Sequence, residues 1–168
     1  MSLTTEQRAA IEATLEKVSG TVLEAVADQH GVKVIDVIDC LPANEVTTVD
    51  AEHFEAVMTD LTEWGDITFI VHTADVVFEA RGQIPQGSMG HGYYNLHGKP
   101  IGGHLRANRC ARIAFVSRLL FGKPSRSVQF YSVDGDCMFK IYLGRDADGA
   151  MYGNQIARFN QLATRLTE

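Results

Sequence analysis

After Gly65 the chain changes from a helical to a two-residue hydrophobic period, and this change limits the possible folds more than any other feature. The run "DITFIVHTADVVFEARGQI" is typical of two strands with a break near Ala74. "GHGYYNLHG" and "IGGHLRA" predict two short strands around a turn at Pro100, and "CARIAFVSRLL" is apolar enough for a buried strand. "SRSVQFYSVDGDCMFKIYLG" predicts a hairpin that turns at Gly135. Together these segments predict an antiparallel meander of about six or seven strands.

The residues before and after this stretch follow a helical period. Four segments precede Gly65: "SLTTEQRAAIEATLEKV", "TVLEAVADQHG", "VKVIDVIDCLP" and "DAEHFEAVMTDLTEWG". "MYGNQIARFNQLATRLTE" returns to the same period at the end of the chain. Helices that precede and follow an antiparallel sheet make an α+β fold. We expect one domain over residues 1–168, mainly helical over 1–64, with the sheet and a C-terminal helix over 66–168.

The composition predicts a cytoplasmic protein. The 3 cysteines lie far apart and form no CxxC pair, which is typical of reduced thiols. No run of about 18 apolar residues occurs, and the N-terminal residues lack the basic and apolar regions of a signal peptide, so we expect no membrane insertion. The formal net charge of −6 argues against nucleic acid as the main partner.

Residues 89–104, "MGHGYYNLHGKPIGGH", concentrate side chains that are suited to hold a ligand. They contain three of the six histidines, two of the five tyrosines and five glycines. If this segment is extended, alternation puts Tyr93 and Asn95 on one face and Tyr94 and Leu96 on the other. Because Leu96 is apolar, we expect the Tyr94 face to be the core face and Tyr93 to point outward.

The following strand carries a second pair of polar side chains. His104 shares a strand face with Arg106, and antiparallel pairing across the intervening turn would bring His104 close to Tyr93. His72, in "FIVHTAD", lies on an earlier strand. The pattern therefore offers a phenol, two imidazoles and a guanidinium as candidate ligand-binding groups.

Three interpretations of the cluster remain open on the residues alone. The first is structural, because tyrosines and histidines are common on half-exposed strand faces. The second is a zinc hydrolase that uses His91, His97 and His104, although no HxH or HExxH pair occurs. The third is haem, because ferric iron accepts a phenolate or an imidazole, glycines let a planar ligand approach the backbone, and Arg106 and Arg109 offer cations for the propionates.

Several motifs in order resemble one known family. These are "VHTAD", "GHGYYNL", "GGHLR" and "MFKIYLGRD", within a similarity that covers about residues 31–165. The chain resembles the HutX/ChuX family of intracellular haem-utilisation proteins. The resemblance implies a HemS/ChuX-like fold with N-terminal helices, a long curved antiparallel sheet and a C-terminal helix.

The resemblance also implies a function and a site. Members of the family are homodimeric carriers that accept imported haem and pass it to a haem-degrading enzyme, so we expect no catalytic residues. The family's haem-site histidines match His72 and His104, and its axial tyrosine matches Tyr93. His72 or His104 is the alternative iron ligand. Arg106, on the same strand face as His104, is expected to pair with a propionate.

Other functions compete with the carrier. Histidine ligation would make the ferrous state more accessible and would favour a haem-degrading enzyme of the haem oxygenase type. The segment "ADQHGVKVIDVIDCLP" resembles a helix-turn-helix, but its second half carries one Lys and two Asp and would meet phosphate poorly. A flavin-binding module is a further alternative, for which the chain offers no phosphate-binding motif.

Overall fold

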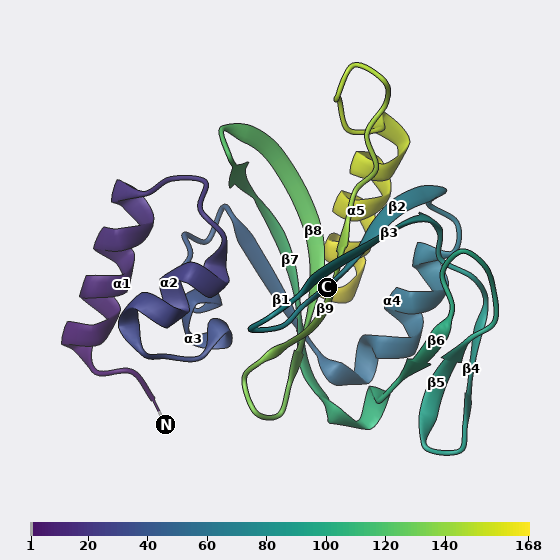
Figure 1. The fold of residues 1–168 in the computed structure, drawn as a ribbon, viewed down its shortest axis with the longest axis horizontal. Coiled ribbons are helices and arrows are strands. Elements are labelled where there is room, and N and C mark those ends of the chain that lie inside the picture. Colours follow the sequence, from purple (N-terminus) through teal and green to yellow (C-terminus); the bar gives the residue numbers. More distant parts are fainter. Residues whose placement is uncertain (1) are drawn as a thin grey trace.

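Two antiparallel sheets form the body of the molecule. The structure is a computed structural model, and it describes residues 2–168. The larger sheet has six strands in the order β1-β7-β8-β9-β2-β3, and the smaller has three in the order β4-β5-β6 (Figure 1). The strands of the larger sheet are β1 Val46–Asp50, β2 Asp66–His72, β3 Val77–Gln83, β7 Cys110–Leu120, β8 Lys123–Ser132 and β9 Cys137–Tyr142. Those of the smaller are β4 Gly87–Gly90, β5 Tyr93–Leu96 and β6 Gly103–Leu105.

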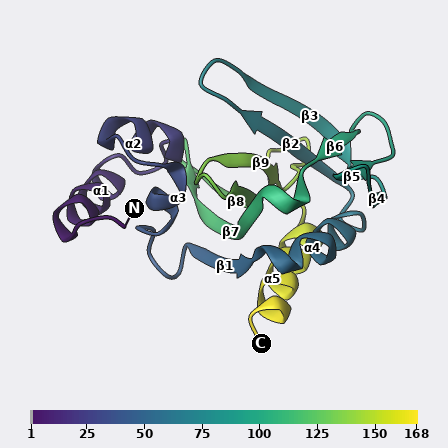
Figure 2. The same cartoon turned by 90° about the horizontal axis from the view of Figure 1, so that it is seen from below.

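Helices cover the larger sheet from two sides. The N-terminal helices α1 Thr5–Lys17, α2 Leu23–His30 and α3 Val34–Ile38 lie together on one side, while α4 Phe54–Leu61 and α5 Gly153–Leu166 lie on the other (Figures 1 and 2). Short 3-10 turns span Ala51–His53 and Ala107–Arg109. The turn of the β2–β3 hairpin points toward α2, away from the three-stranded sheet. The fold class predicted from the sequence is therefore confirmed.

Local sequence signals explain where the first helices begin and end. Thr4 caps α1, since its side chain accepts a hydrogen bond from the Gln7 backbone N–H and the Gln7 side chain accepts one from the Thr4 backbone N–H. Gly31 ends α2 in the left-handed conformation, with φ of 64°. Both residues are of the types that sequence analysis uses as helix start and stop signals.

The core has two parts. The larger part lies between the six-stranded sheet, α4 and α5, and it centres on an aromatic group in which the rings of Phe130 and Phe139 stack with centroids 4.2 Å apart. Phe54 meets Phe130 edge-on from α4, at 5.5 Å between centroids. The smaller part joins the N-terminal helices to the opposite face of the sheet through side chains such as Val26 and Tyr131. Each face of the sheet thus has its own apolar cover.

The strand pairing is more complex than the expected meander. β2 pairs with both β3 and β9, and the chain leaves the larger sheet after β3 to build β4–β6 before it returns at β7. Two strands, β1 and β4, are absent from the sequence-based expectation. β1 is a short edge strand that leads directly into a helical segment, and β4 ("GSMG") has a glycine at each end and little strand propensity.

Membrane-spanning helices were not expected from the sequence. Within residues 2–168, none of the helices combines the length and apolar character that crossing a membrane requires.

All three cysteines are free thiols, of which Cys40 and Cys110 are buried and Cys137 is half-buried. Burial raises the pKa of Cys110 to about 11 and that of Cys137 to about 12, and it also raises the pKa of Cys40. A raised pKa keeps a thiol protonated, and hence weakly nucleophilic, at neutral pH. The three side chains are packing groups in this fold.

This protection predicts a chemical result. We expect the native protein to react slowly with DTNB at neutral pH, because little thiolate is present, and all 3 cysteines to react rapidly once urea unfolds the chain. Free glutathione serves as the rapid control. A native thiol that reacts as fast as glutathione would contradict the burial of these groups.

Candidate functional site

The β4–β5 hairpin determines which side chains of the cluster face outward. Gly90 pairs with Tyr93, so His91 and Gly92 form a two-residue turn, with φ of 54° and 82°. Positive φ at both positions is the type I′ geometry that fits the twist of a hairpin. This turn fixes the register of β5.

Tyr94 anchors the smaller sheet to the core. Its side chain is 3% exposed, and its ring meets Phe54 edge-on at 5.6 Å between centroids. A Cβ at Gly87 would collide with the Tyr94 ring, so glycine is required there for the ring to lie over β4. Burial raises the pKa of Tyr94. The neighbouring Tyr93 must therefore face away from the core.

Three of the predicted site residues meet on that outer face. Arg106 Nη2 donates a hydrogen bond to Tyr93 Oη at 3.2 Å, and its Cζ lies 5.3 Å from the centroid of the Tyr93 ring. The rings of Tyr93 and His104 meet edge-on, with centroids 5.8 Å apart. His104 and Arg106 are exposed and Tyr93 is half-buried. The face thus presents a phenol oxygen and an imidazole beside a guanidinium.

Asn95 lies between these groups, and sequence analysis did not identify it as a site residue. Asn95 pairs with His104 in the β5–β6 register, and Asn95 Oδ1 lies 2.6 Å from His104 Nδ1. Its Nδ2 donates to the backbone carbonyls of Ser88, Gly90 and Tyr93, at 3.2, 3.1 and 3.3 Å. The signal that could have found it was alternation, because Asn95 shares the outward face with Tyr93.

The other histidines of the cluster lie apart. His91 is exposed at the hairpin turn, and His97 Nε2 lies 2.9 Å from Ser88 Oγ. Among residues 2–168, no three His, Cys, Asp or Glu side chains form a group that could hold a metal ion. Two of the cluster's glycines serve the fold, since a Cβ at Gly98 would clash with Pro85 and one at Gly102 with a backbone carbonyl.

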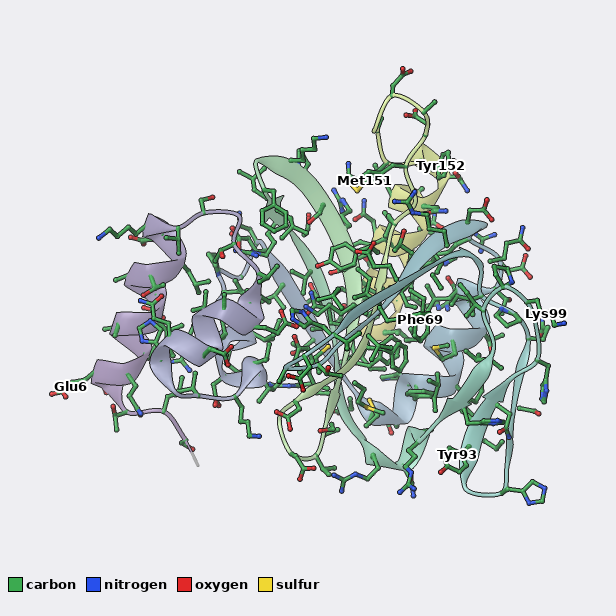
Figure 3. The ribbon with its side chains drawn as sticks, in the orientation of Figure 1. Glu6, Phe69, Tyr93, Lys99, Met151 and Tyr152 are labelled. Atoms are coloured by element: carbon green, nitrogen blue, oxygen red, sulfur yellow. The ribbon has the colours of Figure 1, made fainter. Side chains whose placement is uncertain are left out.

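His72 is not near the other three candidates within one chain. It ends β2 in the larger sheet, where its Nδ1 lies 3.6 Å from Glu24 Oε1 of α2. Tyr93, on β5, and Lys99, in the loop between β5 and β6, lie at the other end of the molecule (Figures 1 and 3). The placement of His72 depends on contacts between α2 and the sheet, which the local sequence does not reveal.

A buried ion pair lies beside His72. Lys140 of β9 is 4% exposed, and its Nζ lies 2.5 Å from Glu24 Oε1. Burial lowers the pKa of Lys140, but the Glu24 carboxylate, together with Tyr142 and Cys137, more than offsets this and raises the pKa. The pair connects α2 to the six-stranded sheet.

Two large cavities within residues 2–168 border His72. One, of about 780 Å³, lies between the N-terminal helices and the sheet. The other, of about 860 Å³, runs along the larger sheet and is lined by apolar and charged side chains of both signs, among them Ile70, Glu79, Arg81 and Lys140. Neither is lined by Tyr93, whose face is open.

The fold and the site together define an α+β protein that carries a phenol, an imidazole and a guanidinium on the outer face of its smaller sheet. Residues 47–162 match the family model described as haem utilisation ChuX/HutX, and one curated relative is 36% identical over 140 residues. The chain belongs to the ChuX/HutX haem-utilisation family.

Individual relatives support this assignment. The 36% identical protein is the intracellular haem transport protein HutX of Vibrio cholerae, and the match covers 82% of this chain and 72% of HutX. Its name supports the cytoplasmic location predicted from the sequence. The solved structure of the haem-binding protein ChuX is 35% identical, with a TM-score of 0.86 over 94% of this chain and 99% of ChuX.

A more distant structure shares only the fold. Apo-PhuS of Pseudomonas aeruginosa is 14% identical, with a TM-score of 0.78. The match covers 96% of this chain but 48% of PhuS. The fold of this chain thus corresponds to about half of that longer chain.

The opposite directions of the two tyrosines predict opposite effects on stability. Tyr94→Ala should lower the free energy of unfolding by about 3–5 kcal/mol, because it empties a core position. Tyr93→Phe should change it by less than about 0.5 kcal/mol, because only an outward hydroxyl is lost. Urea unfolding followed by circular dichroism measures both. Equal losses would show that the register of β5 is different.

Proposed function

We propose that the protein binds haem and carries it during haem-iron utilisation, with Tyr93 as the axial ligand of the iron. The observation that supports this most directly is the outer face of β5 and β6, where Tyr93 Oη lies beside His104 and Arg106. Membership of the haem-utilisation family and the names of HutX and ChuX point to the same ligand.

The residues on this face fit haem chemically. Phenolate and imidazole are both known axial ligands of haem iron, and the planar guanidinium of Arg106 matches a carboxylate such as a propionate. The neighbouring backbone is accessible at Gly103, where a Cβ would meet no atom within 4 Å. When bound, haem supplies the iron, while Tyr93 and His104 supply donor atoms and Arg106 supplies positive charge.

We further propose that the working form is a homodimer. Ligand sites usually cover most of the ligand surface, but the Tyr93 face is open and His72 lies on the other sheet. A second copy would provide the missing cover, and His72 would take part from that copy. The match to about half of PhuS fits a chain that works as a pair. β3 offers an unpaired edge on which Val77 and Phe78 are 54% and 61% exposed.

A carrier fits this donor set better than a degrading enzyme. Phenolate ligation stabilises ferric iron, which suits storage and transfer more than oxygen chemistry. We propose that the acceptor is a haem-degrading enzyme. Incubation of the hemin complex with a reductant distinguishes the two functions, because a carrier leaves the haem intact and a haem oxygenase gives a biliverdin-like product.

DNA binding gains no support. α2 and α3 do form a helix-turn-helix-like pair around Gly31, but α3 has 5 residues, and its Val37 and Ile38 are 0% and 1% exposed. A recognition helix must expose side chains to the major groove. No observation favours a flavin.

Hemin titration tests the proposed ligand. We expect a Soret shift that saturates near one equivalent per subunit, with quenching of the single tryptophan, Trp64. Tyr93→Phe should abolish the ferric tyrosinate spectrum, because the oxygen ligand is lost while the ring remains. Tyr94→Phe is the matched control and should leave the spectrum unchanged. His72→Ala and His104→Ala should weaken binding less than Tyr93→Phe does.

Two results would contradict this assignment. An unchanged ferric spectrum in Tyr93→Phe, together with its loss in His72→Ala or His104→Ala, would make a histidine the ligand. Tight stoichiometric binding of zinc without any response to hemin would exclude the haem carrier altogether.

The homodimer is tested by sedimentation equilibrium. We expect twice the subunit mass of 18.5 kDa at micromolar concentration. Phe78→Lys should favour the monomer, because it charges the exposed β3 edge, while Val133→Lys, at a 55% exposed position between β8 and β9, is the control. A wild-type mass of one subunit that does not change with concentration would contradict the dimer.

A further inference from the structure

Hydrogen bonds around Asn95 determine which way its amide points. Nδ2 donates to three backbone carbonyls, those of Ser88, Gly90 and Tyr93. Only the NH₂ end of an amide can donate, so Oδ1 must be the end that faces His104. Reversing the amide would place its oxygen against three carbonyl oxygens.

This orientation assigns the proton on His104. Asn95 Oδ1 can only accept, and it lies 2.6 Å from His104 Nδ1, so Nδ1 must carry the hydrogen. A neutral imidazole has a single N–H. Nε2 is then left with its lone pair free on an exposed side chain.

We propose that Asn95 is a positioning residue that holds His104 in the Nδ1–H tautomer and so presents the Nε2 lone pair to the ligand. The part that concerns haem rests on the proposed function, whereas the tautomer itself does not. Histidines that act toward a metal typically donate their other N–H to a polar group, which fixes both ring orientation and tautomer. Asn95 provides that group here.

The assignment separates the roles of His104 and Arg106. A neutral His104 of this tautomer cannot donate through Nε2, so it offers an electron pair rather than a hydrogen bond. Tyr93 Oη already receives a hydrogen bond from Arg106. Beside the phenol, the outer face therefore has a donor group, Arg106, and an acceptor nitrogen, His104 Nε2.

Nitrogen-15 NMR of the histidine rings in the haem-free protein tests the tautomer, at a pH where the rings are neutral. In the wild type we expect the proton of His104 on Nδ1. Asn95→Leu, which removes the acceptor, should move it to Nε2, the tautomer that an unconstrained histidine prefers in water. Asn95→Ala, which also removes the acceptor but leaves room for water, should give the same change.

His97 provides an internal control, because its bond to Ser88 lies on the same hairpin. Its signals should be unchanged in the Asn95 variants if the hairpin remains folded, and Ser88→Ala should move the signals of His97 but not those of His104. An Nε2–H tautomer of His104 in the wild type, or an Nδ1–H tautomer in Asn95→Leu, would overturn the proposal. Should Asn95→Leu fail to fold, the wild type and Asn95→Ala decide it.

Hemin affinity tests the consequence for the ligand. Asn95→Leu should weaken hemin binding about tenfold, as loss of such a partner typically does. The same substitution in a His104→Ala background should have no further effect if Asn95 acts through His104. An equal loss in both backgrounds would overturn the positioning role. Absence of hemin binding by the wild type would refute the proposed function, while the haem-free NMR result would still decide the tautomer.

Discussion

The packing of the Tyr94 ring between Phe54 and the backbone of Gly87 determines what the three-stranded sheet exposes. Side chains alternate along a strand, so burial of Tyr94 forces Tyr93 and Asn95 outward. A slip of one residue in β5 would exchange the two faces and bury the phenol that now lies beside Arg106. The I′ turn at His91 prevents that slip by fixing the register from the other end. The arrangement of the candidate ligands is thus a consequence of core packing.

The larger sheet contributes one candidate ligand, His72, and borders the two large cavities. Its cavities lie around His72 and the Glu24–Lys140 pair, at the junction between the N-terminal helices and the sheet. A buried pair of this kind is costly to break, because the remaining charge would be unpaired. α2 is therefore held against β9, and His72 is held beside it. In the proposed homodimer, the open Tyr93 face of one copy and His72 of the other copy would together form one site.

The sequence predicted the elements whose signals are local. The helical periods, the hairpin at Gly135 and the outward direction of Tyr93 all follow from nearest-neighbour patterns. Pairings between distant segments left no such signal, which is why the β2–β9 ladder and the division into two sheets were missed. Strand pairing predicted that Tyr93, His104 and Arg106 lie close together. For Asn95 the only signal was its place on the same strand face as Tyr93. The contact of His72 with Glu24 joins a strand to a helix far away in the sequence, so only the tertiary structure shows it.

Resonance Raman spectroscopy of the ferric hemin complex tests most directly whether Tyr93 supplies a phenolate to the iron. We expect enhanced ring vibrations of a coordinated tyrosinate, which shift when the protein is prepared with ring-deuterated tyrosine. The vibrations report on the bond itself, so they do not depend on how tightly hemin is held. A spectrum without tyrosinate vibrations, in which iron carries only imidazole ligands, would contradict the proposed site.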